Sequence, residues 1–134
     1  MSFLLLALFP QRNLLATNND LHCLAKNVYY EARGESRKGK LAVALVTLNR
    51  VNHKDYPNTV CGVVYQKHQF SWTRKYSKVV NAKQWADAKE IALAAYMDRD
   101  ILGKFTATHF HAKYVNPKWN LRKIATIGQH IFYV

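Results

Sequence analysis

Acidic side chains are scarce in this chain of 134 residues, which carries 20 lysines and arginines against 8 aspartates and glutamates. The formal net charge is therefore +12, and the sequence pI is about 9.9. Such an excess favours a polyanionic partner, either a nucleic acid or an anionic cell envelope, without choosing between them. Only three glutamates occur, Glu31, Glu35 and Glu90, so few side chains could act as a carboxyl general acid.

Cysteine and long apolar runs are also scarce. Cys23 and Cys61 are the two thiols and form no close pair of the kind that binds zinc, which argues against a cysteine-based metal site. A disulfide in an exported setting and two reduced, buried thiols are both compatible with this spacing. The apolar stretch 1–9 is too short to span a bilayer and has no basic n-region, so we expect no transmembrane segment. It could be a truncated export signal, a membrane-touching tip or a segment packed on the domain, and we favour packing.

No repeat, linker or low-complexity tract divides the chain. At this length we expect a single domain over residues 1–134, with its core in about 18–134 and an N-terminal extension in 1–17. We also expect a monomer.

The most informative apolar pattern lies between Leu21 and Arg50. Apolar residues recur there at the spacing of an amphipathic helix: Leu21, Leu24, Ala25, Val28 and Ala32. The polar residues 18–20 predict its N-cap, and Gly34 predicts its end.

Glu31 falls at the edge of this apolar stripe, so its carboxyl group should be half buried. It also lies in the last helical turn, where the helix dipole disfavours an anion. Both effects raise the pKa of Glu31, as a proton donor near neutral pH requires, while the nearby Arg33 would lower it. The ordinary alternative is a glutamate at a helix end that pairs with Arg33 or Arg37.

The rest of the chain predicts an α+β fold that is mainly helical, with a small antiparallel sheet. Residues 41–48 are apolar except for one threonine and predict a buried helix, with a buried strand as the alternative. Thr59 could cap a short helix through Tyr65, and Asn81 with Gln84 resembles the capping box of a helix ending near residue 97. The alternating residues 67–77 suggest a short hairpin or extended loop. Residues 106–114 and 126–134 predict two antiparallel strands, the second broken by Gly128.

Several sequence blocks resemble the SleB/CwlJ-type cell wall hydrolases, which include the catalytic domains of spore-cortex-lytic enzymes and relatives among phage lysins. The blocks occur in the family's order and approximate spacing, and they are Tyr30-Glu31-Ala32-Arg33-Gly34-Glu35, Ala42-Val43-Ala44, Leu48-Asn49-Arg50-Val51, residues 56–65, Gln69-Phe70-Ser71-Trp72 and residues 127–132. The resemblance implies a lysozyme-like fold that acts on the glycan strands of peptidoglycan. It also implies that Glu31 is the catalytic acid and base.

Glycoside hydrolysis with water normally needs two carboxyl groups, but the sequence offers no clear partner for Glu31. Glu35 lies beyond Gly34 and could instead be bonded to backbone in the turn. We therefore favour lytic transglycosylation, in which Glu31 alone cleaves the bond between N-acetylmuramic acid (MurNAc) and N-acetylglucosamine (GlcNAc) and a 1,6-anhydro product forms. A muramidase that uses water, or an amidase, is the alternative on the same substrate.

Polar and aromatic residues along the chain are candidates for the glycan groove, because rings stack on sugars and polar groups bind acetamido and hydroxyl groups. The predicted substrate-binding residues are Tyr30, Gln69, Ser71, Trp72, His111 and Tyr114. Tyr29 or Tyr30 should orient Glu31, while Trp119 and Tyr133 could line the groove or fill the core.

His109 and His111 should face the same side of a strand. No third ligand is evident near them, so we expect hydrogen bonding to substrate or to Glu31, and neither a metal nor a cofactor.

A basic nucleic-acid-binding module is the alternative of another class, suggested by the charge and by the basic and aromatic residues 67–76. No known nucleic-acid motif supports it, so we expect peptidoglycan and the anionic cell envelope as partners and no nucleic acid. A wall-binding module without catalysis is a third possibility, against which the presence of Glu31 speaks. The expected place of action is the bacterial cell wall or periplasm, and a phage-encoded protein made in the host cytoplasm would account for the missing export signal.

Overall fold

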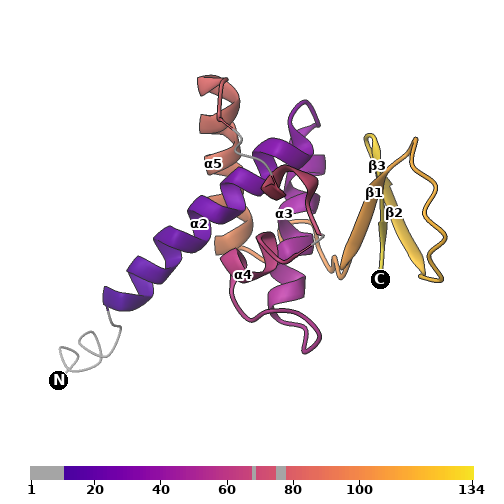
Figure 1. Ribbon diagram of the computed structural model, residues 1–134, viewed down its shortest axis with the longest axis horizontal. Coiled ribbons are helices and arrows are strands. Elements are labelled where there is room, and N and C mark those ends of the chain that lie inside the picture. The colour runs from indigo at the N-terminus through magenta and orange to yellow at the C-terminus, as the bar shows by residue number, and fades with distance from the viewer. Residues whose placement is uncertain (1–10, 68, 75–77) are drawn as a thin grey trace.

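The computed structural model describes residues 11–67, 69–74 and 78–134, with side chains from residue 18 onward, so the apolar stretch 1–9 lies outside the described residues. Helices form the larger part of the molecule and a small sheet lies at one end (Figure 1). The prediction of a mainly helical α+β fold is confirmed. The helices are α2 (Gln11–Ala32), α3 (Arg37–Val51), α4 (Val60–Val64), the 3-10 helix η1 (Ser71–Arg74) and α5 (Ala82–Met97).

Helix α2 begins at Gln11, so the predicted start at residues 18–20 is wrong. Asparagine and aspartate have only a modest helix penalty, and three of them in succession do not end a helix whose neighbours continue it. The predicted end is confirmed, because Gly34 takes a left-handed φ of +91° and the Glu35 N–H donates to Ala32 O at 3.0 Å.

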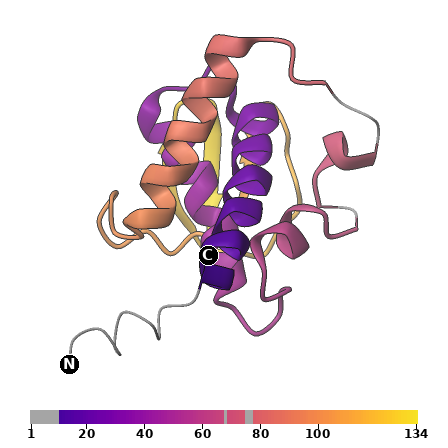
Figure 2. The same ribbon diagram turned by 90° about the vertical axis from the view of Figure 1, so that its left-hand side faces the viewer.

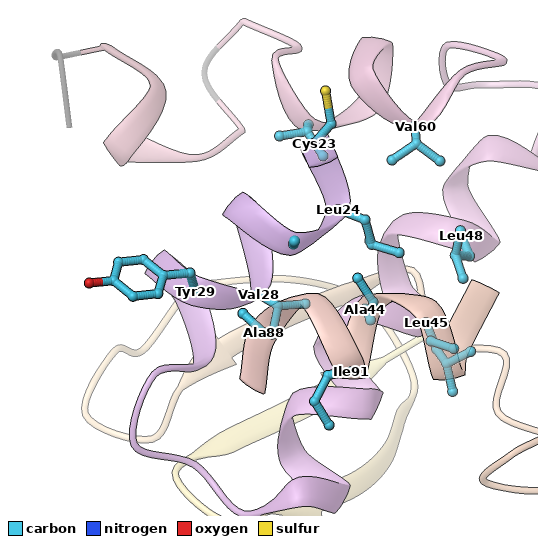
Figure 3. Packing of buried hydrophobic residues seen from close by; sticks show 14 of the residues in the cluster. Cys23, Leu24, Val28, Tyr29, Ala44, Leu45, Leu48, Val60, Ala88 and Ile91 are labelled. Carbon is cyan, nitrogen blue, oxygen red and sulfur yellow. The ribbon is translucent and has the colours of Figure 1, made fainter. Parts of the chain in front are cut away.

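Helix α3 supplies the centre of the core. Every residue from 41 to 48 is buried, which confirms the predicted buried helix and excludes the strand alternative. Leu45 and Leu48 pack with Leu24 of α2 and Ile91 of α5 in one cluster (Figure 3). Figure 2 shows α2 and α5 in front of the sheet. No helix in the described part of the chain is long and apolar enough to span a membrane.

Two predicted helix caps are confirmed. The Gly62 N–H donates to Thr59 Oγ1 at 2.9 Å at the start of α4, and the Gln84 N–H donates to Asn81 Oδ1 at 2.8 Å at the start of α5. The cysteines form a disulfide with a Cα–Cα distance of 5.3 Å, which joins Cys23 of α2 to Cys61 of α4. The disulfide alternative is therefore the one observed.

The sheet has three antiparallel strands, β1 (His109–Ala112), β2 (Lys123–Ile127) and β3 (His130–Tyr133), in the order β1-β3-β2. The predicted pairing of the two C-terminal β regions is confirmed by the register His109 to Tyr133 between β1 and β3. The predicted break at Gly128 is confirmed, but the two sides of it are not one strand. Gly128, at φ +56°, and Gln129 form a turn between the separate strands β2 and β3.

The predicted hairpin or extended loop over residues 67–77 is also wrong for its central part. Residues 71–74 form η1, while residues 68 and 75–77 lie outside the described residues. Hydroxyl bonding to the preceding turn helps to explain the local helix, since Thr73 Oγ1 donates to Phe70 O at 2.7 Å.

Candidate active site

Glu31 lines a cavity of about 480 Å³ at the junction between the helices and the sheet. It is placed there by the last turn of α2, which Gly34 ends, while β1 and the segment after it form the opposite wall. The cavity is lined by Tyr30, Glu31, Arg50, Gln69, Phe70, His109, Phe110, His111, Ala112, Tyr114, Val115, Trp119 and His130. This geometry confirms the predicted half-burial of Glu31.

Burial raises the pKa of Glu31 to about 7, and the positive charge of Arg50 works against this rise. The expected opposing charge, Arg33, instead donates from Nη1 to Tyr29 Oη at 2.9 Å. Arg37 pairs with Glu90 at 2.6 Å, so neither predicted alternative partner binds Glu31. Among the described residues, the Glu31 carboxyl group accepts no hydrogen bond, so burial and the charge of Arg50 decide its pKa.

Arg50 is a site residue that the sequence reasoning missed. The residue is 5% exposed, and it donates from Nε to Thr108 O at 2.7 Å and from Nη1 to Gln69 Oε1 at 3.0 Å. The guanidinium group also lies over the rings of Tyr56 and Phe70. A fixed positive charge therefore lies within electrostatic reach of Glu31, the one carboxyl group among the described residues that line the cavity. The sequence signal that could have identified Arg50 is its position just after the apolar residues 41–48 of α3, where a charged side chain is close to the buried core.

Four of the predicted substrate-binding residues line the cavity: Tyr30, Gln69, His111 and Tyr114. Tyr114 is 90% exposed and projects at the rim. Ser71 and Trp72 lie in η1 and do not line the cavity. Their contact with substrate stays a prediction.

Trp72 contacts the cavity residue Tyr30 without lining the cavity itself. Its ring stacks on Tyr30 with 4.8 Å between ring centroids, and its Nε1 donates to Oδ1 of the buried Asn27 at 3.2 Å. Tyr29 is buried and its hydroxyl accepts from the N–H groups of Val80 and Asn81. Neither Tyr29 nor Tyr30 forms a hydrogen bond with Glu31 in the described part of the chain, so the prediction that one of them orients the acid is not confirmed.

His109 and His111 face the same side of β1, as predicted, and both lie against Trp119. The indole centroid is 5.4 Å from each of the two imidazoles and 5.4 Å from Tyr133. His111 Nε2 is 2.8 Å from Tyr133 Oη. Trp119 lines the cavity, which is one of the two alternatives that the sequence left open for it. Tyr133 is not among the described residues that line the cavity, and it contacts His111 and Trp119 instead. The described residues contain no group of three histidine, cysteine, aspartate or glutamate side chains that could hold a metal ion.

Three other carboxylates that could have paired with Glu31 lie outside its cavity. Glu35 Oε1 accepts from the Gln129 N–H at 2.9 Å, so it binds backbone of the β2–β3 turn rather than of its own turn. Glu90 is exposed and pairs with Arg37. Asp55 lines a second cavity of about 560 Å³ that meets the first at His109. Glu31 is the only carboxylate among the described residues that line the first cavity.

Comparison with known proteins shows a match of residues 34–133 to the protein family described as Cell Wall Hydrolase. The matched range begins after Glu31. The chain is 33% identical over 123 residues to the spore cortex-lytic enzyme of Bacillus subtilis and 32% identical over 123 residues to that of Oceanobacillus iheyensis. These alignments cover 87% of this chain but 38% and 42% of the relatives, so the chain spans about two fifths of their length.

Two solved structures are similar over most of their length. The catalytic domain of the germination-specific lytic transglycosylase SleB from Bacillus anthracis matches with a TM-score of 0.72 and 34% identity, covering 87% of this chain and 94% of that chain. The catalytic domain of the Bacillus cereus SleB protein matches with a TM-score of 0.72 and 33% identity, covering 87% and 91%. These likenesses confirm the lysozyme-like fold that the sequence blocks implied.

Proposed function

The chain belongs to the cell wall hydrolase family, and from this premise we propose that it cleaves the β-1,4 bond between MurNAc and GlcNAc in peptidoglycan. The observation that carries the proposal is Glu31, a carboxyl group whose pKa burial raises to about 7 and which lines a cavity at the junction of helices and sheet. A carboxyl group with that pKa is well populated as an acid at neutral pH and is also a usable base after it has lost its proton.

The proposed reaction has two proton transfers, both at Glu31. The protonated carboxyl group donates its proton to the glycosidic oxygen, the C1–O bond of MurNAc breaks, and the GlcNAc end leaves as an alcohol. The resulting carboxylate then takes the proton of the MurNAc C6 hydroxyl, and the C6 oxygen bonds to C1. A 1,6-anhydro ring forms without water, and Glu31 is protonated again.

The absence of a second carboxylate from the described lining of this cavity supports transglycosylation over hydrolysis. Both common hydrolytic mechanisms use a pair of carboxyl groups that flank the scissile bond. Glu35 is held by the Gln129 backbone and Asp55 lies in the neighbouring cavity. An internal hydroxyl nucleophile removes the need for a second carboxylate.

Arg50 has a role in the charge balance of this reaction. When Glu31 has given up its proton, the buried cavity holds a carboxylate, which low-dielectric surroundings disfavour. The fixed guanidinium of Arg50 offsets that cost and keeps the carboxylate accessible as the base of the second step. Arg50 is thus proposed as a residue that tunes Glu31.

The glycan would lie along the wall made by β1 and Trp119. Trp119 is 40% exposed and presents an aromatic surface on which a sugar ring can stack. Tyr30, Gln69, His111 and Tyr114 supply hydroxyl, amide and imidazole groups toward the acetamido and hydroxyl groups of the sugars. Ser71 and Trp72 would contribute only to a glycan that extends beyond the cavity.

We place the action of this domain at the bacterial cell wall or in the periplasm, where peptidoglycan lies. The net charge of +12 would hold it on the anionic envelope, and we propose that it works as a monomeric catalytic domain. Nucleic acid is not part of this proposal, because the family of the chain and the carboxyl group of Glu31 in the cavity support a glycan substrate.

Product analysis on purified sacculi tests the proposal. Wild-type protein should release fragments that end in 1,6-anhydro-MurNAc, detected by mass spectrometry. Glu31→Gln should release none above background, whereas the matched control Glu90→Gln, at an exposed glutamate, should act like the wild type. Reducing MurNAc ends would assign a muramidase, free peptides would assign an amidase, and full activity of Glu31→Gln would refute the role of Glu31.

A further inference from the structure

Two of the sequence blocks singled out above contain residues that the proposed reaction does not use, Glu35 and His130. They are 95 positions apart in the chain, yet the structure brings them together beside the catalytic cavity. Glu35 follows the glycine that ends α2, and His130 opens β3 directly after the β2–β3 turn. Their meeting joins the helical part of the site to the sheet.

The Glu35 carboxylate is held in one place by the β2–β3 turn. Its Oε1 accepts from the Gln129 N–H at 2.9 Å, and its side chain is 13% exposed. Gly128 leaves the room for it, because a Cβ at that position would lie 2.5 Å from the same oxygen. A glycine is required there twice over, since Gly128 also has a left-handed φ of +56°.

The two ring nitrogens of His130 have different surroundings. Nδ1 is sealed from solvent, lies 3.5 Å from Glu35 Oε1, and has no closer polar partner among the described residues. Nε2 also has no protein partner there but is not among the sealed atoms, and the cavity that His130 lines is the one that holds Glu31. The ring itself is fixed edge-on between Phe110 and Phe132, with centroid distances of 5.1 and 6.2 Å.

We propose that Glu35 is a positioning residue that keeps the proton of His130 on Nδ1, so that Nε2 is a hydrogen-bond acceptor toward the glycan in the catalytic cavity. The inference rests on the proposed function for the identity of the ligand. The donor it would receive is a hydroxyl or acetamido N–H group of an N-acetylated sugar. Glu35 therefore acts on substrate through His130, and not as a second catalytic carboxylate.

The electrostatics of the pocket agree with a neutral imidazole. Burial lowers the pKa of His130, the neighbouring His111 lowers it further, and Glu35 opposes both. In a neutral imidazole one nitrogen donates and the other accepts, and a carboxylate beside Nδ1 fixes which is which. The 3.5 Å separation is longer than an ordinary hydrogen bond, and Glu35 acts on His130 through its charge.

Nitrogen-15 NMR of the histidine rings tests the tautomer without any need for activity. In the wild-type protein at neutral pH, His130 should show a protonated Nδ1 and an unprotonated Nε2. In Glu35→Ala the Nε2 signal should move toward the protonated position, while in the control Glu90→Ala it should stay. A protonated Nε2 in the wild type, or a spectrum that Glu35→Ala leaves unchanged, would overturn the proposal.

Ligand contact is tested in the same spectra with Glu31→Gln protein and an N-acetylglucosamine tetramer as the probe. Saturation of the protein with the tetramer is followed on the indole signal of Trp119. At saturation the Nε2 signal of His130 should shift, while the ring-nitrogen signals of His22 on α2 should not. No response of His130 at saturation would contradict the proposed contact. A failure of Glu31 to matter in sacculus cleavage would refute the proposed function and leave the tautomer result standing.

Kinetic measurements distinguish a role of His130 as a hydrogen-bond acceptor from a role in packing alone. His130→Phe keeps a ring against Phe110 and Phe132 but has no acceptor, whereas His130→Gln offers an amide oxygen. We expect kcat/KM on soluble glycan fragments to fall at least tenfold in His130→Phe, with partial recovery in His130→Gln and thermal unfolding showing both to be folded. Wild-type kcat/KM in a folded His130→Phe would overturn the proposal, and if that variant does not fold, a His130 Nε2 signal that the tetramer leaves unshifted in Glu31→Gln protein would do so.

Discussion

At the scale of single residues, the chemistry of Glu31 depends on two opposing neighbours. Apolar burial stabilises the protonated form, and the guanidinium of Arg50 stabilises the carboxylate. The balance places the pKa at about 7, between the acid needed for the first step and the base needed for the second. The positive charge is fixed in place, because Arg50 is anchored to Thr108 O and Gln69.

The raised pKa of Glu31 predicts that the folded protein is less stable at neutral pH than at acidic pH, as far as this residue contributes. Below pH 4.5 Glu31 is protonated in both the folded and the unfolded state, but between pH 4.5 and about 7 the folded state binds more protons. The stability contributed by Glu31 is therefore lost as the pH rises through this window. The difference between a pKa of about 7 and the ordinary 4.5 corresponds to about 3 kcal/mol.

Glu31→Gln should accordingly gain stability relative to the wild type between pH 4 and pH 8, by about 3 kcal/mol. Urea unfolding of both proteins at the two pH values measures the change. A difference between variant and wild type that is the same at both pH values would show that burial does not hold the proton on Glu31.

Arg50 allows a second prediction at this scale. Removing its charge in Arg50→Gln should raise the pKa of Glu31 further, so the loss of activity at high pH should shift to higher pH. Arg50→Lys keeps the charge and should leave the midpoint near that of the wild type. The pH profile of kcat/KM for both variants is the measurement, and a shift of Arg50→Gln to lower pH would contradict the assigned role.

At the scale of residues, the sequence could predict only features that are decided within one helix or strand. The half-burial of Glu31 followed from helical periodicity within one element, and it is confirmed. Arg50 was missed, and Arg33 was wrongly expected beside the acid, because both outcomes depend on how α3 packs on α2 and on which way a side chain turns. Sequence spacing carries no information about either.

At the scale of elements, predictions held where a side chain bonds to its own backbone. Thr59 and Asn81 cap their helices as expected, because a cap is decided within three residues. The start of α2 and the form of residues 71–74 were wrong, since weak local preferences there yield to packing. Gly128 was read as a break in one strand, whereas its left-handed φ makes it part of a turn between two strands.

The disulfide between α2 and α4 yields a prediction for the helical layer. It closes a loop with a sequence separation of 38, for which the chain-entropy model gives about 4 kcal/mol of stabilisation. The double variant Cys23→Ala, Cys61→Ala should therefore unfold at a clearly lower urea concentration.

Reductant provides the control for this prediction. It should lower the stability of the wild type toward that of the double variant and leave the double variant unchanged. A wild type whose urea midpoint is insensitive to reductant, with the thiols shown to be free, would contradict a stabilising disulfide.

At the scale of the whole molecule, the site exists only where helices and sheet meet. The cavity draws Glu31 from α2, Arg50 from α3, His109 and His111 from β1 and His130 from β3. Helical periodicity and strand alternation could place each residue on its own element but could not assemble them. The family resemblance supplied the lysozyme-like fold, and the packing of the sheet against α2 and α3 then determined which residues share the cavity.

The net charge of +12 gives a prediction for the molecule as a whole. Binding to sacculi and their lysis should weaken as NaCl rises, because the screening length falls from about 10 Å at 0.1 M to about 3 Å at 1 M. Cleavage of short soluble glycan fragments should depend much less on salt, because it does not need attachment to the anionic wall. Equal salt dependence on both substrates would show that the charge serves another purpose.

The central claim is that the folded protein holds a proton on Glu31 near neutral pH. A pH titration of the Glu31 side-chain carboxyl carbon by carbon-13 NMR, in the intact protein, measures this directly. The structure predicts a midpoint at about 7. A midpoint near the ordinary 4.5 would mean that Glu31 is already a carboxylate at neutral pH and could not be the acid that starts the reaction.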